Sequence, residues 1–323
     1  MVGHLYFPAL EPIVNKSSSL SKNIVTDLLK EKMNYDGIIF TDGLEMKGAY
    51  NGTDPDSVCL QAIMAGNDIL LLPINVDASM QIIINAAMND DEVYNRVEES
   101  CKKILRHKYQ LGLDKYKPQS LERLNNDLNQ NRFLSLKQRL YNEAVTMLVN
   151  KKQILPLRNV EGKKIAVVTF GDDNSISKRL NDNGIVNKSF IINNNISEEE
   201  AKRTAKQFKS YDYVILNIRN TSSYPSKNYG ITPAMTSFVN HLPNSIKLIL
   251  NVFGNPYAID KFNFSKNLSS LLVGYEDNEM VANSMIDILI GKMSPKGKLP
   301  VSLRKYKCGY GLEFKGFLSP ETL

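Results

Sequence analysis

The apolar positions in the first third of the chain fall in short runs that alternate with helix-like stretches. Runs at residues 2–7, 37–41 and 69–72 each predict a β-strand. The last run is wholly apolar and ends at Pro73, which is typical of a parallel strand buried on both faces. Strands that alternate with helices indicate βαβ units and therefore a parallel sheet.

The stretches between these strands carry apolar residues at helical spacing. In the first stretch Ser21 is a candidate N-cap, residues 24–29 place apolar side chains on one face, and Asn34 ends the helix. Further helices are predicted at residues 57–66, 77–88 and 91–110. Three parallel strands cannot bury both faces of a sheet, since a barrel has eight strands and an open doubly wound sheet about five. We therefore expect that upstream sequence is absent or that another chain supplies the rest.

The second half of the chain repeats the alternation after a polar stretch. Residues 112–134 are rich in asparagine and lack a clear period, which is typical of a linker, and a helix follows from about Leu136. Strands are then predicted at residues 165–170, 188–192, 213–218, 246–252 and 268–273, with helices near 176–181 and at 198–208, 233–241 and 279–290. This set is complete for an α/β/α sandwich.

Composition narrows the class of protein. With 323 residues, 42% of them hydrophobic, the chain is long enough for two ordinary cores. The formal net charge of +6 comes from basic residues scattered among acidic ones, which favours a solvated mixed surface over a nucleic-acid-binding one. No apolar run reaches the roughly 18 residues of a membrane span. The three cysteines have neither the even count nor the spacing of a disulfide framework or a zinc site.

The first candidate for chemistry is Asp42, which directly follows the apolar run at residues 37–41. In α/β folds the active site lies at the carboxyl end of the parallel strands, so a carboxylate at this point is placed to act on a ligand. An aspartate that caps the following turn or helix would give the same pattern, and spacing alone favours neither reading.

Many segments resemble, in order and spacing, members of glycoside hydrolase family 3. In the first part they are Met1-Val-Gly-His-Leu-Tyr-Phe-Pro-Ala-Leu, Ser19-Leu-Ser, Asn34-Tyr-Asp-Gly-Ile-Ile-Phe-Thr-Asp-Gly-Leu-Glu-Met and Ala62-Ile-Met-Ala-Gly-Asn-Asp-Ile-Leu-Leu-Leu-Pro. Further on they are Glu143-Ala-Val-Thr-Met-Leu-Val-Asn, Ile154-Leu-Pro-Leu, Phe253-Gly-Asn-Pro-Tyr, Gly274-Tyr-Glu and Pro295-Lys-Gly-Lys-Leu-Pro-Val-Ser-Leu. The resemblance covers nearly the whole chain.

This resemblance implies an α/β fold in three parts. Residues 1–113 would form the C-terminal part of a (β/α)8 TIM barrel, incomplete and with about three strands. Residues 114–160 would form a linker and linker helix, and residues 161–323 an α/β/α sandwich domain.

The resemblance also implies a role for Asp42. In the family, the Asp of a (Ser/Thr)-Asp-x-Leu-x-Met segment is the nucleophile of a retaining mechanism, which needs a second group about 5–5.5 Å away as acid and then base. In the β-glucosidase branch that group is a Glu in a sandwich-domain loop, but the matching loop at residues 219–230 has no carboxylate. In the N-acetylglucosaminidase branch it is a His held by an Asp on an upstream barrel loop, near a Lys-His-Phe-Pro-Gly type motif that this chain lacks.

These features favour an exo-β-N-acetylhexosaminidase-like member, since β-glucosidases usually carry Trp beside the nucleophile and this chain has no Trp. A β-glucosidase-type member and a non-catalytic interaction module completed by a partner chain are the alternatives. We expect a substrate with β-linked N-acetylglucosamine or glucose residues, no cofactor, association through the open barrel edge, and little or no activity of this chain alone.

His4 and Met46 are the candidate substrate-binding residues. His4 lies on a predicted strand and would face the pocket, although a hydrogen-bonded structural histidine is the favoured alternative. Met46 would line the sugar pocket, although a methionine at such a position is more often a packing residue.

Overall fold

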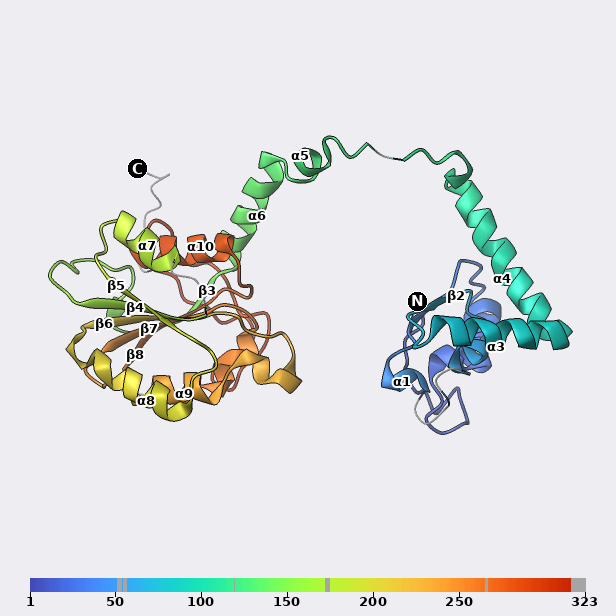
Figure 1. The fold of residues 1–323 in the computed structure, drawn as a ribbon, viewed down its shortest axis with the longest axis horizontal. Coiled ribbons are helices and arrows are strands. Elements are labelled where there is room, and N and C mark those ends of the chain that lie inside the picture. The colour runs from blue at the N-terminus through green and yellow to red at the C-terminus, as the bar shows by residue number, and fades with distance from the viewer. Residues whose placement is uncertain (51–53, 55–56, 119, 172–174, 265–266, 315–323) are drawn as a thin grey trace. The chain divides into compact units, whose positions relative to one another are not determined.

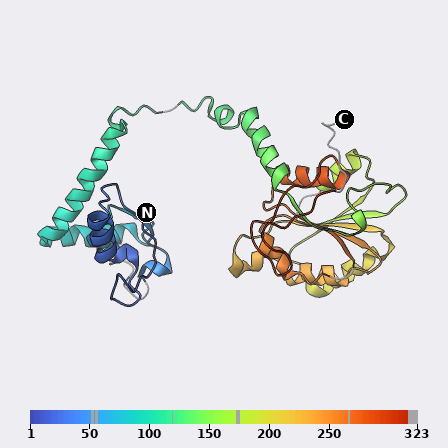
Figure 2. The same cartoon turned by 180° about the vertical axis from the view of Figure 1, so that it is seen from behind.

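The chain folds into two compact units, Met1–Ser120 and Leu121–Leu323. A computed structural model describes residues 1–50, 54, 57–118, 120–171, 175–264 and 267–314. Figure 1 shows the elements of each unit. Figure 2 shows the same elements from behind.

The first unit combines a small parallel sheet with helices. Its strands are β1 (Phe40–Gly43) and β2 (Ile69–Leu71), and Val2 adds one parallel bridge to Thr41. Its helical elements are η1 (Ser18–Leu20), η2 (Asn23–Lys32), α1 (Lys47–Tyr50), α2 (Val58–Ala65), α3 (Val76–Asn89), α4 (Asp91–Gln110) and η3 (Leu113–Lys115).

Three sequence expectations about the bounds of elements in this unit are wrong. The strand predicted at residues 2–7 is a single bridge at Val2, because Leu5 instead accepts from the Ser18 N–H at 2.7 Å and donates to the Ser18 hydroxyl at 3.2 Å. Ser21 does not cap η2, which follows Lys22; its hydroxyl donates to Glu11 Oε2 at 2.5 Å. The second strand also begins at Phe40 and not at residue 37.

The core of the first unit is small. One buried cluster gathers residues of η1, α1, α2 and the loop after β1, and another joins Val25, Ile39 and Ala65. The run predicted to be buried on both faces is only partly buried in β2, and Leu72, which follows it, is 62% exposed. The helices of this unit therefore cover the apolar run incompletely.

The second unit contains a six-stranded mixed sheet in the order β3-β8-β7-β6-β4-β5. All neighbours are parallel except β3, which is antiparallel to β8. The strands are β3 (Thr146–Asn150), β4 (Ile165–Phe170), β5 (Lys188–Ile192), β6 (Tyr213–Ile218), β7 (Lys247–Val252) and β8 (Leu268–Val273). β3 is not among the strands predicted from the sequence, but the bounds of β4, β5, β6 and β8 are those predicted.

Helices lie on both faces of this sheet, with α7 and α10 on one face and α8 and α9 on the other (Figure 1). Successive strand residues point to opposite faces of the sheet and pack in two large hydrophobic cores. Leu216 packs in one core with Phe238, and Ile215 packs in the other with Ile286. The helical elements are α5 (Leu124–Leu128), α6 (Asn131–Ala144), η4 (Lys151–Gln153), α7 (Ser175–Asp182), α8 (Glu198–Lys206), η5 (Gln207–Ser210), η6 (Pro225–Gly230), α9 (Pro233–His241), η7 (Pro256–Lys261) and α10 (Glu279–Ile290). None of the helices in the described ranges has the length and apolarity needed to cross a membrane.

Candidate active site

Asp42 lies in the middle of the three parallel segments of the first unit. Its backbone N–H donates to the Val2 carbonyl at 2.9 Å, and the Leu44 N–H donates across to the Leu71 carbonyl at 2.9 Å. The residue is the penultimate one of β1, which ends at Gly43. Asp42 therefore stands at the carboxyl end of the central segment, the edge where parallel α/β folds bind ligands.

The carboxylate of Asp42 is hydrogen-bonded through one of its two oxygens. Oδ1 accepts the Gly43 N–H at 2.8 Å, and the side chain as a whole is only partly buried. Among the described residues, Oδ2 receives no hydrogen bond, and no hydrogen bond joins the carboxylate to the first turn of α1, which begins at Lys47. The backbone N–H of Gly43 thus orients one carboxylate oxygen, while Oδ2 accepts no hydrogen bond from the described residues.

His4 lies beside the end of β1. Its Nε2 donates to the Gly43 carbonyl at 2.9 Å, and its Nδ1 lies 2.7 Å from the Ser19 hydroxyl. Because a carbonyl oxygen only accepts, Nε2 carries the proton, and in the neutral ring Nδ1 then accepts from Ser19. Both ring nitrogens are engaged within the protein, as expected for the structural alternative.

The hydrogen-bond network continues behind His4. The Asn67 amide donates to the Ser19 carbonyl at 2.8 Å and to the Ala62 carbonyl in α2 at 2.7 Å. Ser19 and Asn67 are both fully buried, where hydrogen bonds hold their positions firmly. The end of β1 is therefore connected through His4 and Ser19 to α2.

A buried carboxylate at Asp68 anchors the start of β1. Its Oδ1 accepts from Arg96 at 3.0 Å and from Ser100 at 2.8 Å, while Oδ2 accepts from Lys103 at 3.1 Å and from the Ile39 N–H at 3.0 Å. Burial alone would raise the pKa of Asp68, but these hydrogen bonds outweigh it and lower the pKa below 3.8. The cluster ties α4 to the strand that leads into Asp42.

The Asp68 cluster was not predicted from the sequence. A signal was present, because Arg96, Ser100 and Lys103 recur at helical spacing on one face of α4. Their shared partner lies 28 or more residues earlier in the chain, a separation that no local pattern reveals.

Met46 approaches the same glycine as His4. Its N–H donates to the Gly43 carbonyl at 3.0 Å, its side chain is 49% exposed, and a Cβ placed on Gly43 would lie 3.8 Å from the Met46 sulfur. The structure thus brings the three residues singled out in the sequence around Gly43. Asp42 precedes Gly43, and His4 and Met46 both bond to its carbonyl.

The carboxylates next to the loop after β6 are engaged in the second unit. Asp277 accepts from the Arg219 side chain at 2.6 and 2.7 Å and from the Asn220 N–H at 2.7 Å. Glu276 accepts from Tyr141 and from the Asn278 amide. Within the described ranges, no group of three His, Cys, Asp or Glu side chains is placed to hold a metal ion.

Family models match most of the chain. The model described as "Glycosyl hydrolase family 3 N terminal domain" matches residues 1–107, and the one described as "Glycosyl hydrolase family 3 C-terminal domain" matches residues 145–315. The chain therefore belongs to glycosyl hydrolase family 3.

Individual relatives carry glycosidase names. A β-hexosaminidase A of Pseudoalteromonas piscicida is 32% identical over 85 residues, which are 24% of this chain and 14% of the relative. A β-glucosidase C of Emericella nidulans is 22% identical over 299 residues, 88% of this chain and 45% of the relative. A family 3 β-N-acetylglucosaminidase structure from Paenibacillus sp. superposes with a TM-score of 0.68 at 20% identity over 90% of this chain and 56% of that one. The chain spans less than two thirds of each of these proteins.

Proposed function

We propose that Asp42 is the nucleophile of a retaining glycoside hydrolase that removes β-linked N-acetylhexosamine from chain ends. The observation that carries the proposal is the oriented carboxylate: Oδ1 is fixed by the Gly43 N–H at 2.8 Å at the carboxyl end of β1. Membership of family 3 supplies the reaction class. The first unit is then the last portion of a (β/α)8 barrel over residues 1–113, and a linker with a linker helix follows it. The α/β/α sandwich expected over residues 161–323 also includes β3, which lies within the range 114–160 expected for the linker.

In this mechanism the free oxygen of Asp42 attacks the anomeric carbon of the sugar. The bond between that carbon and the leaving oxygen breaks, and an acid group donates a proton to the leaving oxygen. Water, deprotonated by the same group, then attacks the anomeric carbon and releases the Asp42 carboxylate with retained configuration. The Gly43 N–H holds the carboxylate in one orientation through both steps, which lowers the cost of alignment.

The acid/base group is proposed to come from outside this chain. The loop at residues 219–230 contains no carboxylate, and the neighbouring Asp277 and Glu276 are bound to Arg219 and Tyr141. A nucleophile without a proton donor leaves the glycosidic oxygen as a poor leaving group. We therefore expect this chain alone to show little or no hydrolysis.

Positioning roles are proposed for the two other residues. His4 holds the Gly43 carbonyl and so fixes the backbone N–H that orients Asp42. Met46, with nearly half of its side chain exposed beside Gly43, offers an apolar contact to the sugar ring.

The competing functions have separate support. A β-glucosidase activity is favoured by the long match to the fungal β-glucosidase C. An interaction role is favoured by large apolar side chains that the first unit exposes, among them Leu5 at 60%, Leu72 at 62% and Val76 at 56%. Such a surface and the incomplete sheet invite association with another chain.

The experiment measures release of a chromophore from a β-N-acetylglucosaminide and from the matching β-glucoside. The chain alone is compared with a hybrid in which the preceding barrel segment of a family 3 N-acetylglucosaminidase is fused ahead of Met1. We expect turnover of the N-acetylglucosaminide by the hybrid only. Equal turnover by the chain alone would refute the external acid/base, and preference for the glucoside would support the β-glucosidase alternative. Sedimentation of the chain tests the interaction role, which requires a self-associated or partner-bound species.

A further inference from the structure

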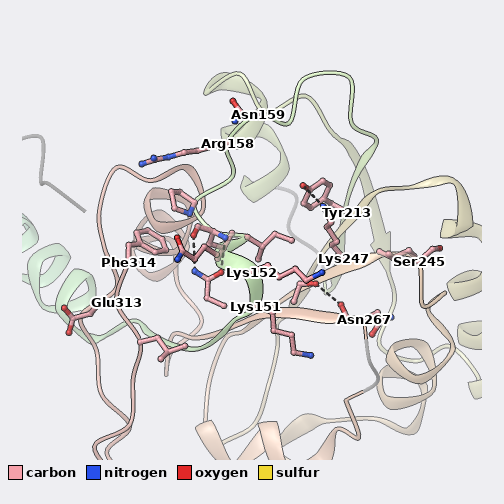
Figure 3. Close-up of a pocket in the computed structure, with 18 of the residues that line it drawn as sticks. Lys151, Lys152, Arg158, Asn159, Tyr213, Ser245, Lys247, Asn267, Glu313 and Phe314 are labelled. Carbon is pink, nitrogen blue, oxygen red and sulfur yellow. Dashed lines mark hydrogen bonds between the residues drawn. The ribbon is translucent and has the colours of Figure 1, made fainter. Parts of the chain in front are cut away.

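The second unit has a cavity of about 770 Å³ at the amino-terminal edge of its parallel strands (Figure 3). The start of β6 at Tyr213, the start of β7 at Lys247 and the residue before β8, Asn267, contribute to its lining. The carboxyl end of antiparallel β3 reaches the same edge through Asn150. The volume suits a small molecule, since ligand pockets commonly measure about 300–1,000 Å³.

The charge of the lining is unbalanced. Lys151, Lys152, Arg158 and Lys247 line the cavity, and none of them has an ion-pair partner within the described ranges. Among the described lining residues the one acidic side chain, Glu313, is paired with Lys298 at 3.0 Å. Figure 3 places Lys151, Lys152 and Lys247 around the middle of the lining, with Arg158 and Glu313 toward its margin. Cations gathered in a concave site raise the local concentration of anions.

The lysine loop is held in an unusual conformation. Lys152 and Gln153 both have φ of 52°, in the left-handed region that side chains other than glycine rarely adopt. Asn150 closes this loop, because its Oδ1 accepts the Leu155 N–H at 3.0 Å and its amide donates to the Leu155 carbonyl at 3.0 Å. Backbone conformations of this kind persist where surrounding contacts impose them, and they cluster at ligand-binding sites.

The remaining lining combines polar, aromatic and aliphatic side chains, and its polar groups suit a hydroxylated ligand. Asn267 and Tyr213 are 3% and 7% exposed, and the Lys247 ammonium lies 3.3 Å from the Tyr213 hydroxyl and 4.8 Å from its ring centroid. Amide and hydroxyl groups from Asn244 and Ser245 add further donors and acceptors. Lysine is a common phosphate-binding residue, and such amides suit the hydroxyl groups of a small polar molecule.

We propose that this cavity binds a small hydroxylated molecule that carries a phosphate monoester, with Lys152 and Lys247 as phosphate ligands. The site lies wholly within the second unit and does not depend on the function proposed for Asp42. It also lies at the edge opposite to the carboxyl ends of the strands, where α/β sheets usually bind substrates.

The test is calorimetric titration of the full chain with N-acetylglucosamine 6-phosphate, its parent N-acetylglucosamine, and inorganic phosphate. We expect the ester to bind at least about tenfold more tightly than either other ligand, as a charge-assisted contact together with a bound sugar body requires. Lys152→Gln and Lys247→Gln should each weaken binding of the ester about tenfold.

Two matched variants separate this site from other causes. Lys209→Gln removes an exposed lysine of η5 outside the cavity and should leave binding unchanged, as should Asp42→Asn in the first unit. Circular dichroism checks that all variants remain folded. Absence of binding, equal affinity for the ester and free phosphate, or equal losses in Lys209→Gln and Lys152→Gln would overturn the proposal; the last result would indicate general attraction of anions to the basic surface.

Discussion

The two units differ in how deeply their parallel strands are buried. Every residue of β6 in the second unit is buried, whereas β2 in the first unit has none that is fully buried. Yet the polar groups around Asp42 are densely bonded, through Gly43, His4 and the buried Ser19. The comparison shows that the second unit owes its order to its own apolar core, whereas the first unit orders its site by hydrogen bonds beside a sheet that its helices cover only in part.

The largest expected effect comes from the core of the second unit. Phe238 is fully buried and packs edge-to-face on Phe170, with ring centroids 5.4 Å apart. Phe238→Ala should lower the free energy of unfolding of this unit by about 3–5 kcal/mol, because it leaves a cavity. Hydrogen exchange resolved by mass spectrometry measures the loss for peptides of each unit separately.

The matched control for that comparison is Leu72→Ala in the first unit. Because Leu72 is 62% exposed, the change should stay within about 0.5 kcal/mol. A loss of several kcal/mol for Leu72→Ala would mean that this side chain is buried in solution and that the sheet of the first unit is covered there.

The next effect concerns the buried carboxylate of the first unit. Asp68→Asn leaves Arg96 and Lys103, which are 11% and 15% exposed, without their anion. We expect a loss of about 3 kcal/mol in hydrogen-exchange protection of the first unit. Glu99→Gln, which removes the 61% exposed partner of Arg96, should cost less than about 1 kcal/mol; similar losses in the two variants would contradict the anchoring role of Asp68.

Acid should weaken the first unit through the same residue. The folded pKa of Asp68 is lowered from 3.8, so the unfolded chain binds the proton more readily. The stabilisation is therefore complete above about pH 4 and is lost as the pH falls through the folded pKa. We expect the free energy of unfolding, measured between pH 6 and pH 2, to fall less steeply with falling pH in Asp68→Asn than in the unchanged chain. An equal fall in both proteins would count against a stabilising role of the ion cluster.

Helix caps should give the smallest and most similar effects in the two units. Asn75 accepts the Ala78 N–H at 3.1 Å at the start of α3, and Thr232 accepts the Met235 N–H at 3.3 Å at the start of α9. Asn75→Ala and Thr232→Ala should each cost about 1 kcal/mol. A much larger loss for one cap, measured by the same exchange experiment, would show that local effects differ between the units as strongly as the cores do.

The fold of the second unit could be predicted from the sequence more accurately than that of the first unit. β4, β6 and β8 were predicted at their observed bounds because strands covered on both faces read as continuous apolar runs. The edge strand β5 was also predicted at its observed bounds. β3 was missed because it begins at Thr146, directly after the end of α6 at Ala144, with no turn signal between the two elements. In the first unit the run at residues 2–7 has strand-like composition, but it pairs with β1 only at Val2. The backbone groups of Leu5 are hydrogen-bonded to Ser18 and not to a strand.

The candidate site was predictable in its chemistry more than in its geometry. The position of Asp42 at the end of an apolar run could be read from the sequence, and so could its resemblance to a family motif. The contacts of His4 with Gly43 and Ser19 join residues 39 and 15 positions apart. Such contacts depend on how the strands assemble, which no local period encodes.

The central claim is tested most directly by trapping the covalent intermediate on Asp42. The hybrid with a completed barrel is treated with a 5-fluoro N-acetylglucosaminyl fluoride, whose fluorine slows hydrolysis of the glycosyl-enzyme, and its peptides are analysed by mass spectrometry. The account predicts one sugar attached to the peptide that contains Asp42, and none after Asp42→Asn. Attachment to a different carboxylate, or unchanged labelling of the Asp42→Asn variant, would contradict it.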